Sequence, residues 1–300
     1  MPTRRTFLEA SLAAGAALTV RSKLMSNPGA TPGAPLLAGV ARGGDLDFPP
    51  TKPAEGPQKP PFPVHDYHVH LSNTLTIDQA LQLAKDRGVQ IGILEHSGPG
   101  YPINTDADLQ HYIDNLRKYP VRIGLQPVYP GWSRAFSKPV LDQLDYILMD
   151  ALTLPNPDGT YLAIWQIDTH VDAADAFIER YMQFIEQVLT TEPIDIFGWP
   201  TFLPAPIARE YQRLWTTKRI DKIIDLCANP KTTFRAKKIA IEIKEVAHVP
   251  DENFITRAKH AGLKFTFGTD SRNQNAAHFY YCYQMAQRCG LTEGDMFVVK

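Results

Sequence analysis

The stretch VHDYHVHL, residues 64–71, places two histidines two positions apart in a short strand-like run. Residues i and i+2 of a β-strand point to the same face, so His68 and His70 would project together. Two imidazoles held side by side are a ready pair of ligands for a divalent metal ion. The alternative is an ordinary pair of strand histidines, each satisfied by a hydrogen bond. Which reading holds depends on what other residues reach the same place.

Strand-like runs of this kind alternate with amphipathic helix patterns along the chain. One helix pattern, TIDQALQLAKDRG, carries a capping box made by Thr76 and Gln79 and ends at Gly88. The strand-like runs cover residues 64–71, 89–96, 121–129, 145–152, 194–200, 237–246 and 263–270.

A strand, helix, strand order at this spacing predicts parallel strands joined by right-handed crossovers. Seven such units favour an α/β fold of the (β/α)7 type, a distorted TIM-like barrel that spans residues 63–300. An open, doubly wound sheet is the structural alternative. No glycine-rich phosphate loop follows the first strand-like run, and this disfavours a nucleotide-binding sheet.

The residues before the barrel read as a targeting segment and a tether. Residues 1–25 contain Arg4, Arg5, Phe7 and Leu8 followed by an Ala/Leu stretch, which resembles a twin-arginine export signal. The alternative is a basic N-terminus with a short helix. Residues 26–62 are rich in Pro, Gly and Ala and predict a semi-rigid linker. We therefore expect a periplasmic or secreted protein whose partner is the twin-arginine export machinery.

The composition is that of a globular protein, with 44% hydrophobic and 21% charged residues. The formal net charge of −1 gives no reason to expect a nucleic-acid or anionic-membrane partner. We find no uninterrupted apolar run of roughly 18 residues, so we expect no stable membrane anchor. The three cysteines, an odd number, argue against a disulfide framework.

Polar residues cluster where the predicted strands end, which is where β/α barrels carry their chemistry. Buried parallel strands are normally apolar, and an unpaired buried charge is costly. A metal ion or a polar substrate would offset that cost. The residues at these ends are His68, His70, Glu95, His96, Gln126, Asp150, Trp199, Glu242, Lys244, Asp270 and Arg272.

Three of these motifs together resemble the polymerase and histidinol phosphatase (PHP) family: H-x-H, LEHS at 94–97 and FGTDSR at 267–272. The resemblance implies a distorted (β/α)7 barrel with a metal cluster, often used for phosphoester hydrolysis. This chain departs from the family pattern at three positions. Gln126 stands where the family usually has a bridging glutamate, Trp199 replaces a ligand histidine, and Arg272 replaces the histidine of D-x-H.

These departures favour a single zinc, manganese or iron ion over a full cluster, because a neutral amide bridges two cations poorly. The expected ligands are His68, His70 and Asp270, and His96 or a carboxylate would complete the shell. Asp270 could instead cap the following helix, and His96 could instead contact the substrate.

The candidates for acid/base catalysis are His96, Asp150 and Glu242. Each has a structural alternative. Asp150 could cap a turn, and Glu242 could pair with Lys244. Because Glu95 precedes His96 on a strand, we expect its side chain to point the opposite way.

Positive charge beside the proposed metal favours an anionic substrate group such as phosphate or carboxylate. The candidate substrate-binding residues are Gln126, Arg134, Lys244 and Arg272. Three tryptophans, Trp132, Trp165 and Trp199, could offer flat surfaces for a sugar ring. The alternative for both groups is ordinary packing and solvated arginines.

Three functions are compatible with this sequence. The first is an exported, PHP-type hydrolase that uses metal-activated water on a phosphoester or a sugar derivative. The second is a metal-assisted lyase or isomerase that acts on a carbohydrate acid. The third is a degenerate barrel that binds a sugar or a metal without turnover.

Overall fold

The computed structural model describes residues 56–299, so the expected signal segment and most of the expected linker lie outside the described residues. The strands are β1 (Val64–His70), β2 (Val89–Leu94), β3 (His96–Ser97), β4 (Arg122–Pro127), β5 (Tyr146–Met149), β6 (Thr153–Pro155), β7 (Tyr161–Ala163), β8 (Ile196–Phe197), β9 (Ala240–Lys244) and β10 (Phe265–Gly268). The α-helices are α1 (Ile77–Arg87), α2 (Asp106–Leu116), α3 (Lys138–Leu141), α4 (Ala174–Thr191), α5 (Tyr211–Leu214), α6 (Thr217–Ala228), α7 (Glu252–His260) and α8 (Tyr281–Arg288).

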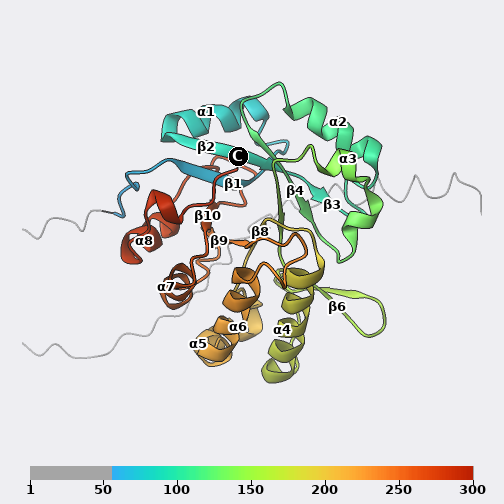
Figure 1. Ribbon diagram of the computed structural model, residues 1–300, viewed down its shortest axis with the longest axis vertical. Helices are drawn as coiled ribbons and strands as arrows, with labels where there is room; N and C mark the ends of the chain where they lie inside the picture. The colour runs from blue at the N-terminus through green and yellow to red at the C-terminus, as the bar shows by residue number, and fades with distance from the viewer. Residues whose placement is uncertain (1–55, 300) are drawn as a thin grey trace, which may run out of the picture. The chain divides into compact units, whose positions relative to one another are not determined.

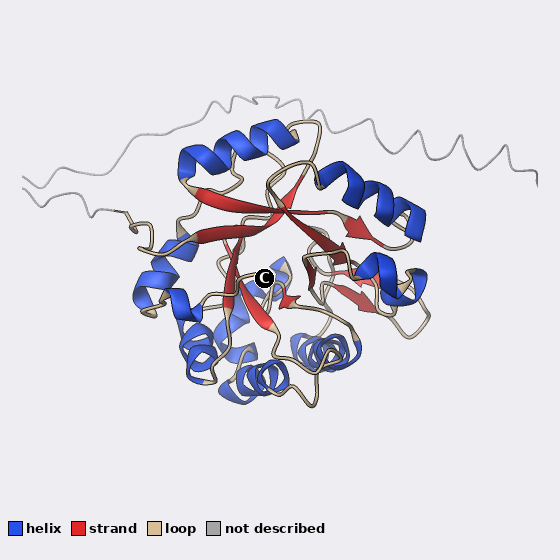
Figure 2. Ribbon diagram, turned by 45° about the horizontal axis from the view of Figure 1, so that its top comes forward, coloured by secondary structure: helices blue, strands red, loops and turns tan. Residues whose placement is uncertain are grey.

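Seven of these strands close into a parallel barrel, which confirms the predicted fold class. The ring runs β1, β2, β4, β5, β8, β9, β10, and β10 pairs with β1. The short β3 comes directly after β2 and pairs with β4. Figures 1 and 2 show the helices arranged around the outside of the strands.

The barrel has two apolar clusters, one between the strands and the helices and one inside the ring of strands. The larger core lies between strands and helices and includes Phe254 of α7 and Phe267 of β10. A smaller cluster draws Tyr67, Tyr146 and Leu148, among others, from several strands of the ring. Because its members come from around the ring, this cluster fills the interior of the barrel. Polar residues fill the interior at the other end, described below.

Local signals account for the helix boundaries. Thr76 and Gln79 form the predicted capping box of α1, and Gly88 ends the helix in the left-handed region at φ 61°. The start of α8, at Tyr281, is fixed by a distant side chain. This is the Glu245 carboxylate, which accepts from the backbone N–H groups of residues 280, 281 and 282.

A two-stranded hairpin, β6–β7, was not predicted. It is antiparallel, and the turn between its strands contains the sequence NPDG at 156–159. Asn, Pro, Asp and Gly are the residues that favour tight turns, so this signal was present in the sequence. Figure 1 shows the hairpin projecting away from the ring of strands. None of the helices within residues 56–299 combines the length and apolarity needed to cross a bilayer.

Asp66 joins the first and last strands of the barrel. It is fully buried and accepts hydrogen bonds from the backbone N–H groups of His68, Thr269 and Ala277, and from the Thr269 hydroxyl. The chain leaves β10 and turns toward α8 around this one carboxylate. Buried donors that lose their acceptor cost about 1–3 kcal/mol each.

We therefore expect Asp66→Ala to lower the free energy of unfolding by ~3–5 kcal/mol in chemical denaturation. The matched control is Asp142→Ala, which removes an exposed carboxylate paired with Lys138 and should change the free energy of unfolding by less than about 1 kcal/mol. Equal effects of the two substitutions would contradict this account of the ring closure.

Candidate functional site

Closure of the barrel brings residues from the two ends of the described chain together. β1 and β10 are parallel neighbours, with Asp66 opposite Phe267 and Val69 opposite Ser271. The His70 N–H donates to the Ser271 carbonyl at 3.0 Å. Asp270, which comes just after β10, therefore lies beside the inward-facing histidines of β1.

His68, His70 and Asp270 converge as predicted. Asp270 Oδ1 lies 3.4 Å from His68 Nε2 and 3.3 Å from His70 Nε2. One potential ligand atom from each of the three side chains lies within 4.8 Å of the other two. A tetrahedral ion with bonds of about 2.0–2.1 Å would set its ligand atoms about 3.4 Å apart. The buried triad can therefore hold a metal ion.

A second observation supports a ligand at this place. His70 is buried, and within residues 56–299 its Nδ1 has no hydrogen-bond partner, while its Nε2 has only the 3.3 Å contact with Asp270 Oδ1, whose geometry is not that of a hydrogen bond. A buried polar atom without a partner is costly and rare. Burial lowers the pKa of His70 to about 3, so its imidazole is neutral and has a free lone pair near neutral pH. A metal ion would satisfy it.

His96 and Glu95 extend the triad on one side. The rings of His70 and His96 are stacked at 4.6 Å, and His70, Glu95 and His96 form a second group of potential ligands. Glu95 was expected to point away, and this was wrong. β2 ends at Leu94, so strand alternation does not extend to residue 95, and the carboxylate turns back to accept from the His96 N–H.

Glu242 lies behind His68 and orients it. Its Oε1 is 2.6 Å from His68 Nδ1, and both side chains are fully buried. Burial opposes the charge on Glu242, but Lys244 and His68 outweigh it and lower the pKa of this carboxyl. The carboxylate therefore accepts the Nδ1 proton and leaves Nε2 as the nitrogen that can bind a metal.

Two glycines make room for this carboxylate inside the barrel. A Cβ at Gly268 would collide with Glu242 Oε1, and a Cβ at Gly198 would lie 3.2 Å from Oε2. Gly198 follows β8 and Gly268 ends β10, the two neighbours of β9. Because Glu242 is sealed behind His68, its position favours a positioning role over the acid/base role expected from the sequence.

Lys244 was expected to contact substrate, and the structure places it elsewhere. Its side chain is fully buried, with Nζ 3.2 Å from Asp270 Oδ2 and 4.5 Å from the centre of the Trp199 ring. Burial opposes the charge on Asp270, but Lys244 and His68 outweigh it and hold the pKa of Asp270 well below its usual range. Lys244 thus faces the ligand carboxylate from inside the barrel.

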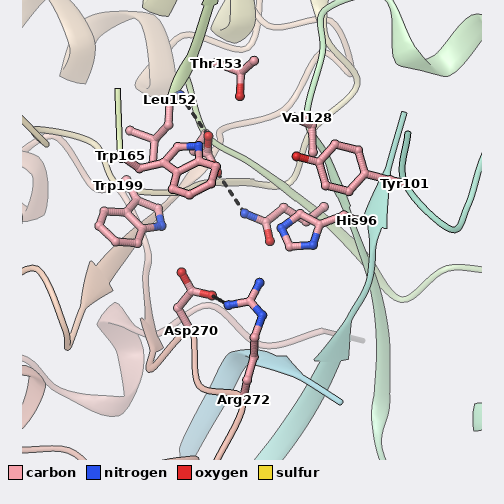
Figure 3. A pocket seen from close by; sticks show the side chains of 11 residues that line it. His96, Tyr101, Val128, Leu152, Thr153, Trp165, Trp199, Asp270 and Arg272 are labelled. Carbon is pink, nitrogen blue, oxygen red and sulfur yellow. Dashed lines mark hydrogen bonds and ion pairs between the residues drawn. The ribbon is translucent and has the colours of Figure 1, made fainter. Parts of the chain in front are cut away.

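A cavity of about 510 Å³ opens directly beside the triad. This volume suits a small organic molecule. In Figure 3, Trp165 and Trp199 lie on one side of the cavity and His96 and Tyr101 on the other, with Asp270 and Arg272 between the two sides. The lining residues are His96, Tyr101, Gln126, Val128, Asp150, Leu152, Thr153, Trp165, Trp199, Asp270 and Arg272.

Gln126 and Asp150 connect the cavity to the triad. Gln126 Oε1 lies 3.2 Å from His68 Nε2, and its amide nitrogen donates to Asp150 Oδ2 at 2.9 Å. Asp150 also accepts from the Leu152 N–H, so the turn-cap alternative holds in part. Burial raises the pKa of Asp150, which helps this carboxyl to hold a proton.

Other expected contacts are absent from the cavity lining. Arg134 does not line the cavity, because the 3₁₀ helix Trp132–Ala135, which begins after Gly131 at φ 75°, buries Trp132 and leaves Arg134 exposed. Trp132 is buried in the outer core beside Phe136, so it offers no surface to a ligand. Tyr101 was missed because its loop carries no motif that marks it.

Comparisons with known proteins add little to this geometry. No protein-family model matches the chain, and no curated protein matches it. The chain is similar to one in the cryo-EM structure of archaeal ribonuclease P with mature tRNA, at 11% identity and a TM-score of 0.34, over 79% of this chain and 98% of that one. It is also similar to a beta-mannanase from Streptomyces thermolilacinus, at 13% identity and a TM-score of 0.29, over 70% and 80%. Likenesses this distant carry no argument about activity.

We expect His70→Ala to weaken divalent metal binding by more than about 100-fold, because even the loss of a partner behind a ligand typically costs 10–100-fold. Metal content after loading with zinc or manganese and desalting measures this. His65→Gln is the matched control, since His65 lies on the same strand, bonded to Gln90 and away from the triad. Metal retention by His70→Ala would remove this residue from the ligand set.

Proposed function

We propose that this chain is a metal-dependent hydrolase of the PHP type that acts on a small anionic substrate. The convergence of His68, His70 and Asp270 beside an open cavity carries the proposal. When bound, a divalent cation supplies Lewis-acid chemistry that polarises a substrate oxygen and makes water a stronger acid. The site best suits zinc, manganese or iron, since its donors are imidazole and carboxylate.

The surrounding residues have distinct roles in this proposal. Glu242 keeps the Nδ1 proton on His68 and so presents Nε2 to the ion. Asp150 lines the cavity, and burial raises its pKa, so we assign it the role of the acid that donates a proton to the leaving group. His96 lines the same cavity and can bind the ion or relay a proton.

The cavity lining favours a substrate that joins an anionic group to a flat body. Arg272 is half-exposed at the lining and pairs with Asp270 Oδ1 at 3.1 Å. Its guanidinium can bind a phosphate or carboxylate beside the metal site. Tyr101, Trp165 and Trp199 offer aromatic faces to the rest of the molecule. This combination supports a phosphoester of a ring-containing alcohol, such as a sugar phosphate.

The test is a panel of phosphoesters and glycosides, assayed with purified protein after loading with zinc, manganese or iron. We expect metal-dependent release of phosphate by the wild type and none by His70→Ala. Elimination products in place of phosphate would support a lyase instead. Metal binding without turnover of any compound would support a degenerate binding barrel.

Arg272→Gln should raise KM about 10–100-fold for an anionic substrate, because a charge-assisted hydrogen bond is worth about 1.5–3 kcal/mol. Arg134→Gln is the matched control, since Arg134 is exposed and does not line the cavity. Steady-state kinetics of both variants measure the effect. A larger rise in KM for Arg134→Gln than for Arg272→Gln would make Arg134 the anion-binding residue.

Export by the twin-arginine route is part of the proposal and rests on the Arg4-Arg5 pair and the apolar stretch after it. We expect replacement of both arginines by lysine to leave the protein in the cytoplasm, because the export machinery reads the guanidinium pair. Cell fractionation and immunoblotting measure the distribution. Unchanged export of the double variant would show that this segment is not such a signal.

A further inference from the structure

We propose that Lys244 is a built-in cation: its ammonium fills the position beside Asp270 and Glu242 that a second metal ion would otherwise occupy. The inference rests on the proposed metal-dependent function and concerns how many ions the site takes. It assigns Lys244 to the metal chemistry of the site and not to substrate binding.

The contacts of the Lys244 ammonium are those of a bound cation. Its Nζ lies 3.2 Å from Asp270 Oδ2 and 3.4 Å from Glu242 Oε1. Both are carboxylate oxygens, and the ammonium lies between the two carboxylates. Carboxylate oxygens are ligands that divalent metals use in proteins.

Asp270 uses its two oxygens on opposite sides. Oδ1 faces the imidazoles of His68 and His70, whereas Oδ2 faces Lys244. A carboxylate arranged in this way bridges two cations in two-metal sites, which hold their ions about 3.5–4 Å apart. Here the Oδ1 side lies against the two imidazoles that would share an ion with it, and also pairs with Arg272, whereas the Oδ2 side is filled by the ammonium.

Lys244 cannot easily leave this position. Its side chain has no exposed surface, and the Trp199 ring covers the ammonium at 4.5 Å. Moving it would leave the buried carboxylate of Glu242 without its compensating charge, which is costly. The neighbouring polar group, Gln126, is a neutral amide and adds no negative charge to attract a second ion.

Lys244→Met tests the inference, because it keeps a long side chain and removes the charge. After loading with manganese and desalting, we expect Lys244→Met to retain one more manganese ion per chain than the wild type, measured by elemental analysis. Lys244→Arg is the matched control that keeps the charge and should retain the wild-type content. Adding Glu242→Gln to Lys244→Met should remove the additional ion, because one of its carboxylate ligands is lost.

The two proposals fail in different ways. Equal manganese content in the wild type and folded Lys244→Met overturns the role of Lys244 and leaves the metal site intact. A wild type that binds no divalent ion overturns the proposed function and this inference with it. If Lys244→Met does not fold with or without manganese, anomalous scattering from manganese-soaked wild-type crystals locates the bound ions and tests the inference instead. A peak between Asp270 Oδ2 and Glu242 overturns the inference, and a peak confined to the His68 and His70 side supports it.

Discussion

The buried carboxylate of Glu242 is the constraint on which the rest of the site depends. A carboxylate enclosed in a barrel must be compensated by nearby charge and hydrogen bonds. Here His68 donates to it and Lys244 lies beside it. The same contacts orient the His68 ring and bring the ammonium to Asp270. Gly268 leaves space that a larger residue would take from the carboxylate. The contacts that compensate the charge of Glu242 are therefore the same contacts that position the expected metal ligands His68 and Asp270.

Closure of the barrel assembles the site around Glu242. Asp270 reaches the histidines because β10 pairs with β1 in a register that places Val69 opposite Ser271. Asp270 and Trp199 both have positive φ angles, 49° and 50°, directly beyond their strands. Such backbone conformations are uncommon outside glycine and concentrate where function requires them. They aim both side chains at Lys244 from two different strands.

The two ends of the barrel interior differ in polarity. Tyr67, Tyr146 and Leu148 belong to an apolar cluster that stabilises one end through hydrophobic packing. The other end holds the charged groups and opens into the cavity between Trp165 and His96. A rigid apolar support below and a polar layer above keep the ligand atoms in place, and this is the arrangement that precise catalytic geometry requires.

The sequence by itself determined the alternation of strands and helices, the shared face of His68 and His70, and the capping box at Thr76, because each depends on neighbours only a few residues away. The position of Asp270 was predictable only once a closed ring was assumed. The tertiary structure decided three further features. These are the burial of Glu242 and Lys244, the approach of the Glu95 carboxylate to His70 and His96, and the exclusion of Arg134 from the cavity. Side-chain periodicity says which face a residue takes. Strand register, chain turns at strand ends and burial decide what that face meets, and these arise from contacts between segments far apart in the chain.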